Sequence, residues 1–222
     1  MKRFECRAIL FDLDGVLVDS TSYVEDQWRR WAVSKGLPPE PFLAICHGRR
    51  ALETIQLAAP HLDAAAEVAA FEPDDLPNRA SIAPIDGAAA LLQMLPTESW
   101  AVATSGTRAT ATARLRHAGL LLPRVLICAE DVRHGKPNPD VYLAAAAGLA
   151  AAPPDCVVIE DAPAGIQAAR AAGMSVIALT TTHRAHELQA DAQVNSLRAI
   201  HVAHLDHSRG GAGFLELLVL DS

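Results

Sequence analysis

Short apolar segments alternate with helical patterns along most of the chain, and this alternation restricts the folds that it can adopt. The segments that we expect to be strands are 8–11, 99–104, 124–128, 156–160 and 175–179. The helical patterns that separate the later ones lie at 87–95, 107–118, 139–149 and 163–172. Such repeats are typical of a parallel sheet with helices on both faces. We therefore predict an α/β fold with a Rossmann-like parallel sheet core.

Residues 20–83 interrupt the alternation, because no convincing strand lies among them. Three apolar residues there share one helical face, and they are Val24, Trp28 and Trp31. Further helical stretches follow before Pro84. We expect an inserted α-helical cap domain at 20–83, on a catalytic core made of 1–19 and 84–222. Near the C-terminus, apolar segments at 199–202 and 214–219 flank glycine-rich residues, which predicts a C-terminal β-hairpin.

Composition excludes several classes of partner. The formal net charge of −7 argues against nucleic acid or an anionic membrane as the main partner. No run approaches the roughly 20 apolar residues that cross a bilayer, and charged residues interrupt any signal-like segment at the start. The four cysteines are scattered, so neither zinc nor a disulfide framework is expected. We expect a cytoplasmic monomer or weak dimer.

Two acidic residues end the first predicted strand, in the segment Phe11-Asp12-Leu13-Asp14-Gly15. Side chains at i and i+2 share one side of an extended chain, so Asp12 and Asp14 can face one pocket. Two charges about 4 Å apart repel by roughly 4 kcal/mol at an effective dielectric near 20. Such a pair needs a cation, a shared proton or open solvent. Taken alone, two solvated acids at a turn fit these residues equally well.

Polar residues also follow three later predicted strands. Ser105 and Gly106 open a helix, where hydroxyl and amide groups can bind an anion, although a helix cap is the simpler interpretation. Pro137 and Pro139 stiffen the loop that presents Lys136. The strand at 156–160 ends in Glu160 and Asp161. Because ligands bind beyond the carboxyl ends of parallel strands, the four strand ends together predict a site for Mg²⁺ and a phosphate.

The same segments resemble the haloacid-dehalogenase-like hydrolase superfamily over essentially the whole chain. More narrowly, they are similar to its helical-cap branch of small sugar-phosphate and glycerol-3-phosphate phosphatases. The sequence segments on which this resemblance rests are FDLDGVLVDS, CHGRRALETI, VATSGT, HGKPNPD and VIEDAPAGIQAARAAG. The resemblance implies a magnesium-dependent phosphoric monoester hydrolase that acts on a small phosphorylated metabolite through an aspartyl-phosphate.

The resemblance also implies a role for each matching residue. Asp12 would be the nucleophile, and Asp14 would protonate the leaving alkoxide and then activate water. The phosphate-binding residues would be Ser105, Gly106 and Lys136. The metal ligands would be Asp12, Asp161 and the backbone carbonyl of Asp14, with Glu160 close by.

Alternatives to a phosphatase stay open. Sugar phosphomutases of this family carry a histidine in the first cap helix, where this chain has Val24, so the sequence favours hydrolysis. A non-catalytic phosphate-binding regulatory protein would be expected to lose one of the four motifs, and none is lost. In the cap, His47, Arg49 and Arg50 are expected to contact the leaving group, with a solvated basic loop as the alternative. Glu72 and Arg79 are weaker candidates.

Overall fold

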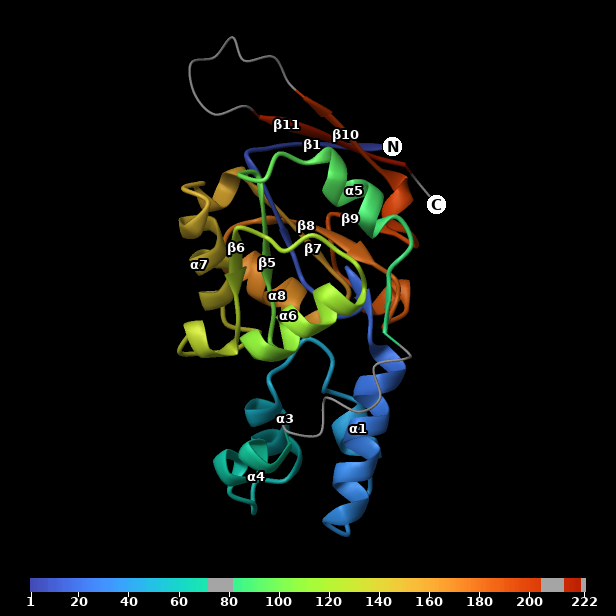
Figure 1. Cartoon of the computed structure of the whole chain (residues 1–222), viewed down its shortest axis with the longest axis vertical. Coiled ribbons are helices and arrows are strands. Elements are labelled where there is room, and N and C mark those ends of the chain that lie inside the picture. The colour runs from blue at the N-terminus through green and yellow to red at the C-terminus, as the bar shows by residue number, and fades with distance from the viewer. Residues whose placement is uncertain (72–81, 205–213, 221–222) are drawn as a thin grey trace.

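A six-stranded parallel sheet forms the centre of the computed structural model, which describes residues 1–71, 82–204 and 214–220 (Figure 1). The strand order is β6-β5-β2-β7-β8-β9. The strands are β2 (Ala8–Phe11), β5 (Trp100–Ala103), β6 (Val125–Ile127), β7 (Cys156–Glu160), β8 (Ser175–Leu179) and β9 (Ala192–Val194). Every residue of β2, β5 and β7 is buried, as central strands covered on both faces require. The predicted α/β core is confirmed, and β9 adds a strand that was not predicted.

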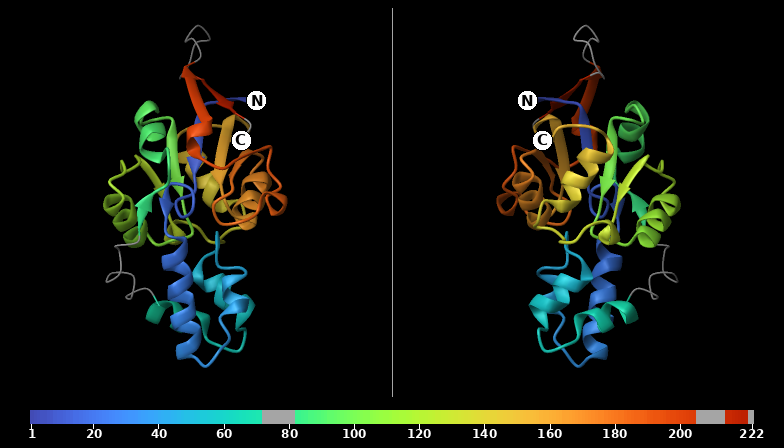
Figure 2. Two further views of the ribbon diagram at one scale, coloured as in Figure 1. Left: turned by 90° about the vertical axis from the view of Figure 1, so that its right-hand side faces the viewer. Right: turned by 90° about the vertical axis from the view of Figure 1, so that its left-hand side faces the viewer.

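Helices cover the two faces of this sheet with separate apolar clusters. They are α5 (Ala88–Met94), α6 (Arg108–His117), α7 (Asp140–Gly148) and α8 (Pro163–Ala171), and short 3₁₀ turns lie at Ala129–Asp131, Pro153–Asp155, Ala185–Glu187 and Leu197–Ala199. Leu91 of α5 and Leu115 of α6 pack with Ile9 and Phe11 on one face. Tyr142 of α7 and Ile166 of α8 pack with Leu10 on the other. Figure 2 shows α6 and α8 on opposite sides of the sheet.

A second, antiparallel sheet lies at the end of the molecule far from the helical insertion (Figure 1). Its order is β1-β11-β10, from β1 (Lys2–Cys6), β11 (Leu215–Val219) and β10 (Ile200–His204). The β10–β11 pair contains the two strands of the predicted hairpin, and residues 205–213 between them lie outside the described residues. The structure adds β1, which pairs with β11 from the other side.

The helical insertion carries its own apolar core at the carboxyl ends of the parallel strands (Figure 1). Its helices are α1 (Thr21–Ser34), α2 (Glu40–Leu43), α3 (Ala51–Ala58) and α4 (Ala64–Phe71). The ring of Trp28 stacks on Phe42 with centroids 5.7 Å apart, and Trp31 meets Phe42 edge-on. The tryptophans therefore build the core of the insertion, as their helical spacing predicts.

The chain enters and leaves the insertion at adjacent positions. β3 (Val18–Asp19) precedes α1, and β4 (Ala83–Pro84) returns antiparallel beside it. This antiparallel pair, Val18 with Pro84 and Asp19 with Ala83, brings together the two ends of the insertion. Glu72 and Arg79 lie outside the described residues. Over the described ranges, no helix combines the length and apolar character that a membrane crossing requires.

Candidate active site

Asp12 lies directly beyond the buried strand β2, and the residue is only 3% exposed. Its amide still donates to the carbonyl of Ile159 in β7 at 3.0 Å, so the sheet fixes its position. The chain then turns at Gly15, where φ is +79°. A Cβ at Gly15 would lie 2.0 Å from Oδ2 of Asp161, so only glycine lets the turn pass this carboxylate.

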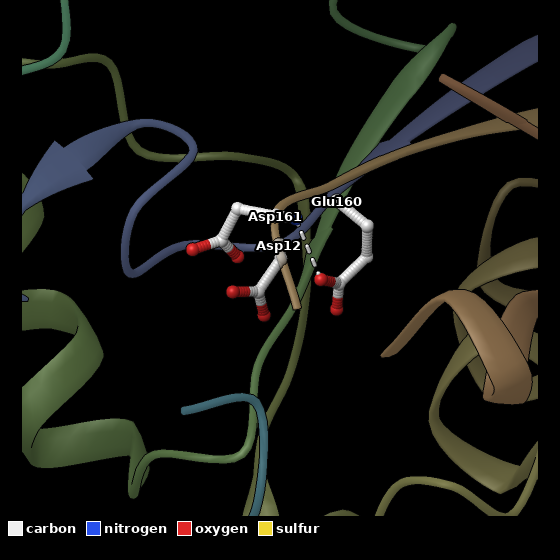
Figure 3. Close-up of side chains that lie close together, drawn as sticks. All are labelled: Asp12, Glu160 and Asp161. Atoms are coloured by element: carbon white, nitrogen blue, oxygen red, sulfur yellow. Dashed lines mark hydrogen bonds between the residues drawn. The ribbon is translucent and has the colours of Figure 1, made fainter. Parts of the chain in front are cut away.

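Three buried carboxylates meet where β2 and β7 end, namely those of Asp12, Glu160 and Asp161 (Figure 3). One carboxylate oxygen from each of the three residues lies within 4.8 Å of the corresponding oxygens of the other two. Burial raises the pKa of Asp12 to about 7 and that of Asp161 well above its ordinary value. Oδ1 of Asp161 is buried and has no hydrogen-bond partner among the described residues. A buried acceptor without a donor, beside two further carboxylates, fits a bound cation.

Lys136 supplies the one cation that the described structure places within this cluster. Its ammonium, 1% exposed, donates to Oδ1 of Asp12 at 2.6 Å and to Oε1 of Glu160 at 2.8 Å. Burial alone would lower the pKa of Lys136, but these two carboxylates raise it above its ordinary value. The ammonium also lies 4.9 Å from the ring centroid of Tyr142. Lys136 is therefore a fixed positive charge beside Asp12.

Glu160 holds this lysine in place. Its Oε1 accepts from Lys136 and from the Tyr142 hydroxyl, and its Oε2 accepts from the amides of Asp161 and Ala162. Burial would raise the pKa of Glu160, but these partners hold it below its ordinary value. The four donors occupy the lone-pair positions of the carboxylate. A Cβ at Gly165, in the first turn of α8, would lie 1.5 Å from Oε1, so this carboxylate fits against the helix because residue 165 is a glycine.

Asp14 belongs to a different hydrogen-bond set from Asp12. Its Oδ1 accepts from the Ser20 hydroxyl and from Nη1 of Arg114, both at 2.6 Å. Arg114 extends from α6 and is 7% exposed, with its guanidinium 5.7 Å from the Tyr23 ring centroid. Asp14 lines the pocket together with Asp12, but Arg114 and Ser20 fix where its carboxylate points.

Two of the predicted phosphate-binding residues, Ser105 and Gly106, line the same pocket as Asp12 and Asp14, and the volume of this pocket is about 360 Å³. The hydroxyl of Ser105 donates to the carbonyl of Gly48 in the insertion at 3.0 Å. The amide of Gly106 donates to Oγ1 of Thr104 at 3.1 Å. Thr107, in contrast, caps α6 by accepting from the amide of Thr110. The helix-cap interpretation thus holds for Thr107, while Ser105 faces the insertion.

The predicted cap residues separate into different environments. His47 lies 3.6 Å from Glu25 and faces the ring of His183, and burial together with His183 lowers its pKa. Arg49 lines the pocket, and its guanidinium makes no hydrogen bond or ion pair with any described residue. Arg50 lines the pocket too, but its guanidinium is bound to Glu53 and to backbone carbonyls of the core.

Comparison with known proteins identifies the family. Residues 6–173 match the family model described as haloacid dehalogenase-like hydrolase. The chain belongs to the haloacid dehalogenase-like hydrolases. Hexitol phosphatase A of Escherichia coli is 42% identical to it over 205 residues, which span 89% of this chain and 94% of that protein. Glycerol-1-phosphate phosphohydrolase 2 of Saccharomyces cerevisiae is 37% identical over 188 residues, spanning 79% and 75%. A solved hydrolase from Pseudomonas syringae is 27% identical, with a TM-score of 0.76 and coverage of 86% of this chain and 94% of that one.

Two parts of this hydrolase's site were not predicted from the sequence. The first is Arg114, which lies three residues after buried Ala111 and just before Leu115 on the apolar face of α6. A charged arginine on the apolar face of a helix is unusual, and this would have indicated from the sequence that Arg114 has an acidic partner. The second is the loop after β8, where Thr181 donates to the carbonyl of Gly15 and Thr182 donates to Oδ2 of Asp161 at 2.6 Å. Here the signal was a further hydroxyl-rich strand end.

Proposed function

We propose that this hydrolase is a magnesium-dependent phosphatase that cleaves small phosphomonoesters, above all sugar or polyol phosphates, through an aspartyl-phosphate. One observation carries the proposal. The buried carboxylate of Asp12 lies 2.6 Å from the Lys136 ammonium and beside the unpartnered oxygen of Asp161, where the pocket meets the insertion. This arrangement offers a nucleophile, a fixed positive charge and a cation site to one phosphoryl group.

Mg²⁺ fits the donor set, because it prefers hard oxygen ligands and works with substrate phosphates. Asp12, Asp161 and the backbone carbonyl of Asp14 would hold it, and Glu160 lies within the same carboxylate cluster. When bound, the ion would offset the charge of the carboxylates and of the phosphoryl group.

Side chains of the protein carry out the nucleophilic attack and the proton transfers. The carboxylate of Asp12 attacks phosphorus while Asp14 gives a proton to the departing alkoxide oxygen. Asp14 then takes a proton from the water that cleaves the Asp12 acyl phosphate. Ser105, the amide of Gly106 and Lys136 would bind the phosphoryl oxygens, and for this the Ser105 hydroxyl would leave the carbonyl of Gly48 and the Gly106 amide would leave Thr104. Arg114 and Ser20 keep the Asp14 carboxylate in one orientation, which a residue that serves as acid and then as base requires.

The insertion at 20–83 acts as a cap domain that selects the leaving group. Its separate apolar core and its side-by-side connections support this assignment. Its pocket wall is mostly apolar, from Val24, Trp28, Val68 and Phe71, with Gln27, His47 and Arg49 as polar groups. A polyol or sugar presents both CH surfaces and hydroxyls to such a wall. The names of the hexitol and glycerol phosphatases point to the same chemical class.

Hydrolysis rather than phosphoryl transfer to a second position is supported by Val24. This residue lines the pocket from the first cap helix, where the resemblance would place the histidine of a mutase. Val24 offers no group to take or give a proton.

The test is phosphate release over a panel of hexitol, glycerol and sugar phosphates, with and without Mg²⁺. We expect hydrolysis of at least one class, dependence on the ion, and no turnover by Asp12→Asn. A beryllofluoride complex formed in the presence of Mg²⁺ would report the acyl-phosphate geometry independently of the substrate. Full activity of Asp12→Asn would contradict the mechanism, and isomerised sugar phosphate in the NMR spectrum would indicate a mutase.

A further inference from the structure

Arg50 lies at the start of α3 in the insertion, and its guanidinium is bound both to Glu53 of the insertion and to backbone carbonyls of the core. Nη1 donates to the carbonyls of Ala129 and Val132, each at 3.3 Å. Nη2 donates to the carbonyl of Arg133 at 3.2 Å and also to Glu53, and Nε donates to Glu53 at 2.7 Å. A guanidinium has five N–H donors. All of them have acceptors here, so none is left for a substrate.

Glu53 extends the same contact to the catalytic lysine. Its Oε1 accepts from the amide of Gly135 at 3.2 Å, one residue before Lys136. A Cβ at Gly135 would lie 2.6 Å from Nε of Arg50 and 2.8 Å from Oε1 of Glu53. The close approach of the two segments therefore requires glycine at this position.

The core segment bound by this pair is continuous. Its bonded residues run from Ala129, which lines the pocket, to Gly135, and the next residue is Lys136, whose ammonium lies 2.6 Å from Oδ1 of Asp12. Two charged side chains of the insertion thus hold the loop that delivers the fixed positive charge to the nucleophile. These bonds form only while the insertion is seated on the core.

We propose that Arg50 and Glu53 are positioning residues that form a latch. The latch holds the insertion against the core and fixes the loop 129–136 that carries Lys136. Arg50 is accordingly not a ligand of the leaving group, although it lines the pocket beside Arg49. The kinetic part of this inference rests on the proposed phosphatase function, whereas the contact between Glu53 and Gly135 does not.

Arg49 offers a matched control, because it is the same residue type in the same loop. It lines the pocket, and its guanidinium has no partner among the described residues. Its guanidinium is available to the hydroxyls of a substrate. Removing Arg49 should alter the preference among substrates, whereas removing Arg50 should slow all substrates alike because it contacts none of them.

The experiment compares Arg50→Met, Glu53→Gln and Arg49→Met in the full chain. The first readout is hydrogen exchange of the Gly135 amide in ¹⁵N-glycine-labelled protein without substrate. Arg50 fixes both the Glu53 acceptor and the loop that carries Gly135, so Arg50→Met should open the latch and speed this exchange about 10- to 100-fold. Glu53→Gln keeps an oxygen acceptor and should speed the exchange less, and Arg49→Met should not change it. The second readout is kcat/KM for two or more phosphate esters.

We expect Arg50→Met to lower kcat about 10- to 100-fold, because the lysine loop loses its fixed position. The ratio of kcat/KM between substrates should stay unchanged in Arg50→Met and should change in Arg49→Met. Unchanged exchange at Gly135, or an altered substrate ratio in Arg50→Met, would overturn the latch. If Arg50→Met does not fold, the Gly135 exchange rate and the substrate ratio of kcat/KM in Glu53→Gln decide instead. If the wild-type protein cleaves no phosphate ester, the proposed function fails, and the exchange measurement still decides the latch.

Discussion

Replacing Gly165 by alanine should destabilise the protein, although alanine favours helices more than glycine does. Within α8 the exchange alone would raise the free energy of unfolding by up to about 1 kcal/mol. The new Cβ, however, would lie 1.5 Å from Oε1 of Glu160 and 2.0 Å from its Cδ. Glu160 cannot simply move aside, because donors from Lys136, Tyr142 and two backbone amides hold its carboxylate.

The magnitude follows from the contacts that must change. Overpacking in a buried site costs about 1–3 kcal/mol, and one lost hydrogen bond to a charged group about 1.5–3 kcal/mol. After subtraction of the helix preference, Gly165→Ala should lower the free energy of unfolding by about 3 kcal/mol. In a chain of this length, that corresponds to a fall in Tm of about 6–12 °C. The activity at temperatures where the variant is folded should also fall, because Glu160 positions Lys136.

Calorimetry and urea unfolding measure the effect directly. The control is Gln167→Ala in the same helix, where the side chain is exposed and the expected change is within about 0.5 kcal/mol. An unchanged or higher Tm for Gly165→Ala would refute the reasoning, since it would mean that the Glu160 carboxylate is not held against α8.

Three further perturbations test other parts of the structure. Arg114→Met should slow hydrolysis of alkyl phosphates about 10- to 100-fold but spare p-nitrophenyl phosphate, whose leaving group needs little protonation by Asp14; equal losses in steady-state kinetics would contradict this. Because burial raises the pKa of Asp12 from 3.8 to about 7, its contribution to stability should be full below pH 3.8 and be lost as the pH rises to about 7. Added Mg²⁺ should raise Tm most above that pH, because it binds the carboxylate form, and thermal melts across pH check both trends. Trp28→Ala should lower the free energy of unfolding of the insertion by about 3–5 kcal/mol. Urea unfolding followed through the NMR signals of residues in the insertion measures this change.

The parallel core could be predicted because local sequence determines it. Each central strand is a short apolar run, and the observed strands of the parallel sheet other than β9 lie within the expected segments. Asp12, Lys136, Glu160 and Asp161 were expected together because the carboxyl ends of parallel strands meet, and the structure brings them together. The roles assigned to them remain predictions.

Other features depend on partners far along the chain. β1 contains Lys2, Arg3 and Glu5 and shows no apolar run, so only its pairing with β11 near the other end makes it a strand. Similarly, Arg49 and Arg50 are indistinguishable in sequence. The structure separates them because the carbonyl acceptors of Arg50 lie about eighty residues away. Such contacts follow from tertiary packing and leave no local pattern.

The antiparallel sheet joins the two ends of the described chain on the side away from the pocket (Figure 1). Because β11 pairs with both β1 and β10, a deletion that removes β11 would leave two strand edges without partners. Unpaired edges promote association between molecules, so shortening the chain at that point invites aggregation. An affinity tag or surface linker added before β1 would, in contrast, extend away from the insertion and leave the entrance to the pocket open. The antiparallel sheet is thus a suitable place at which to attach the protein to a surface.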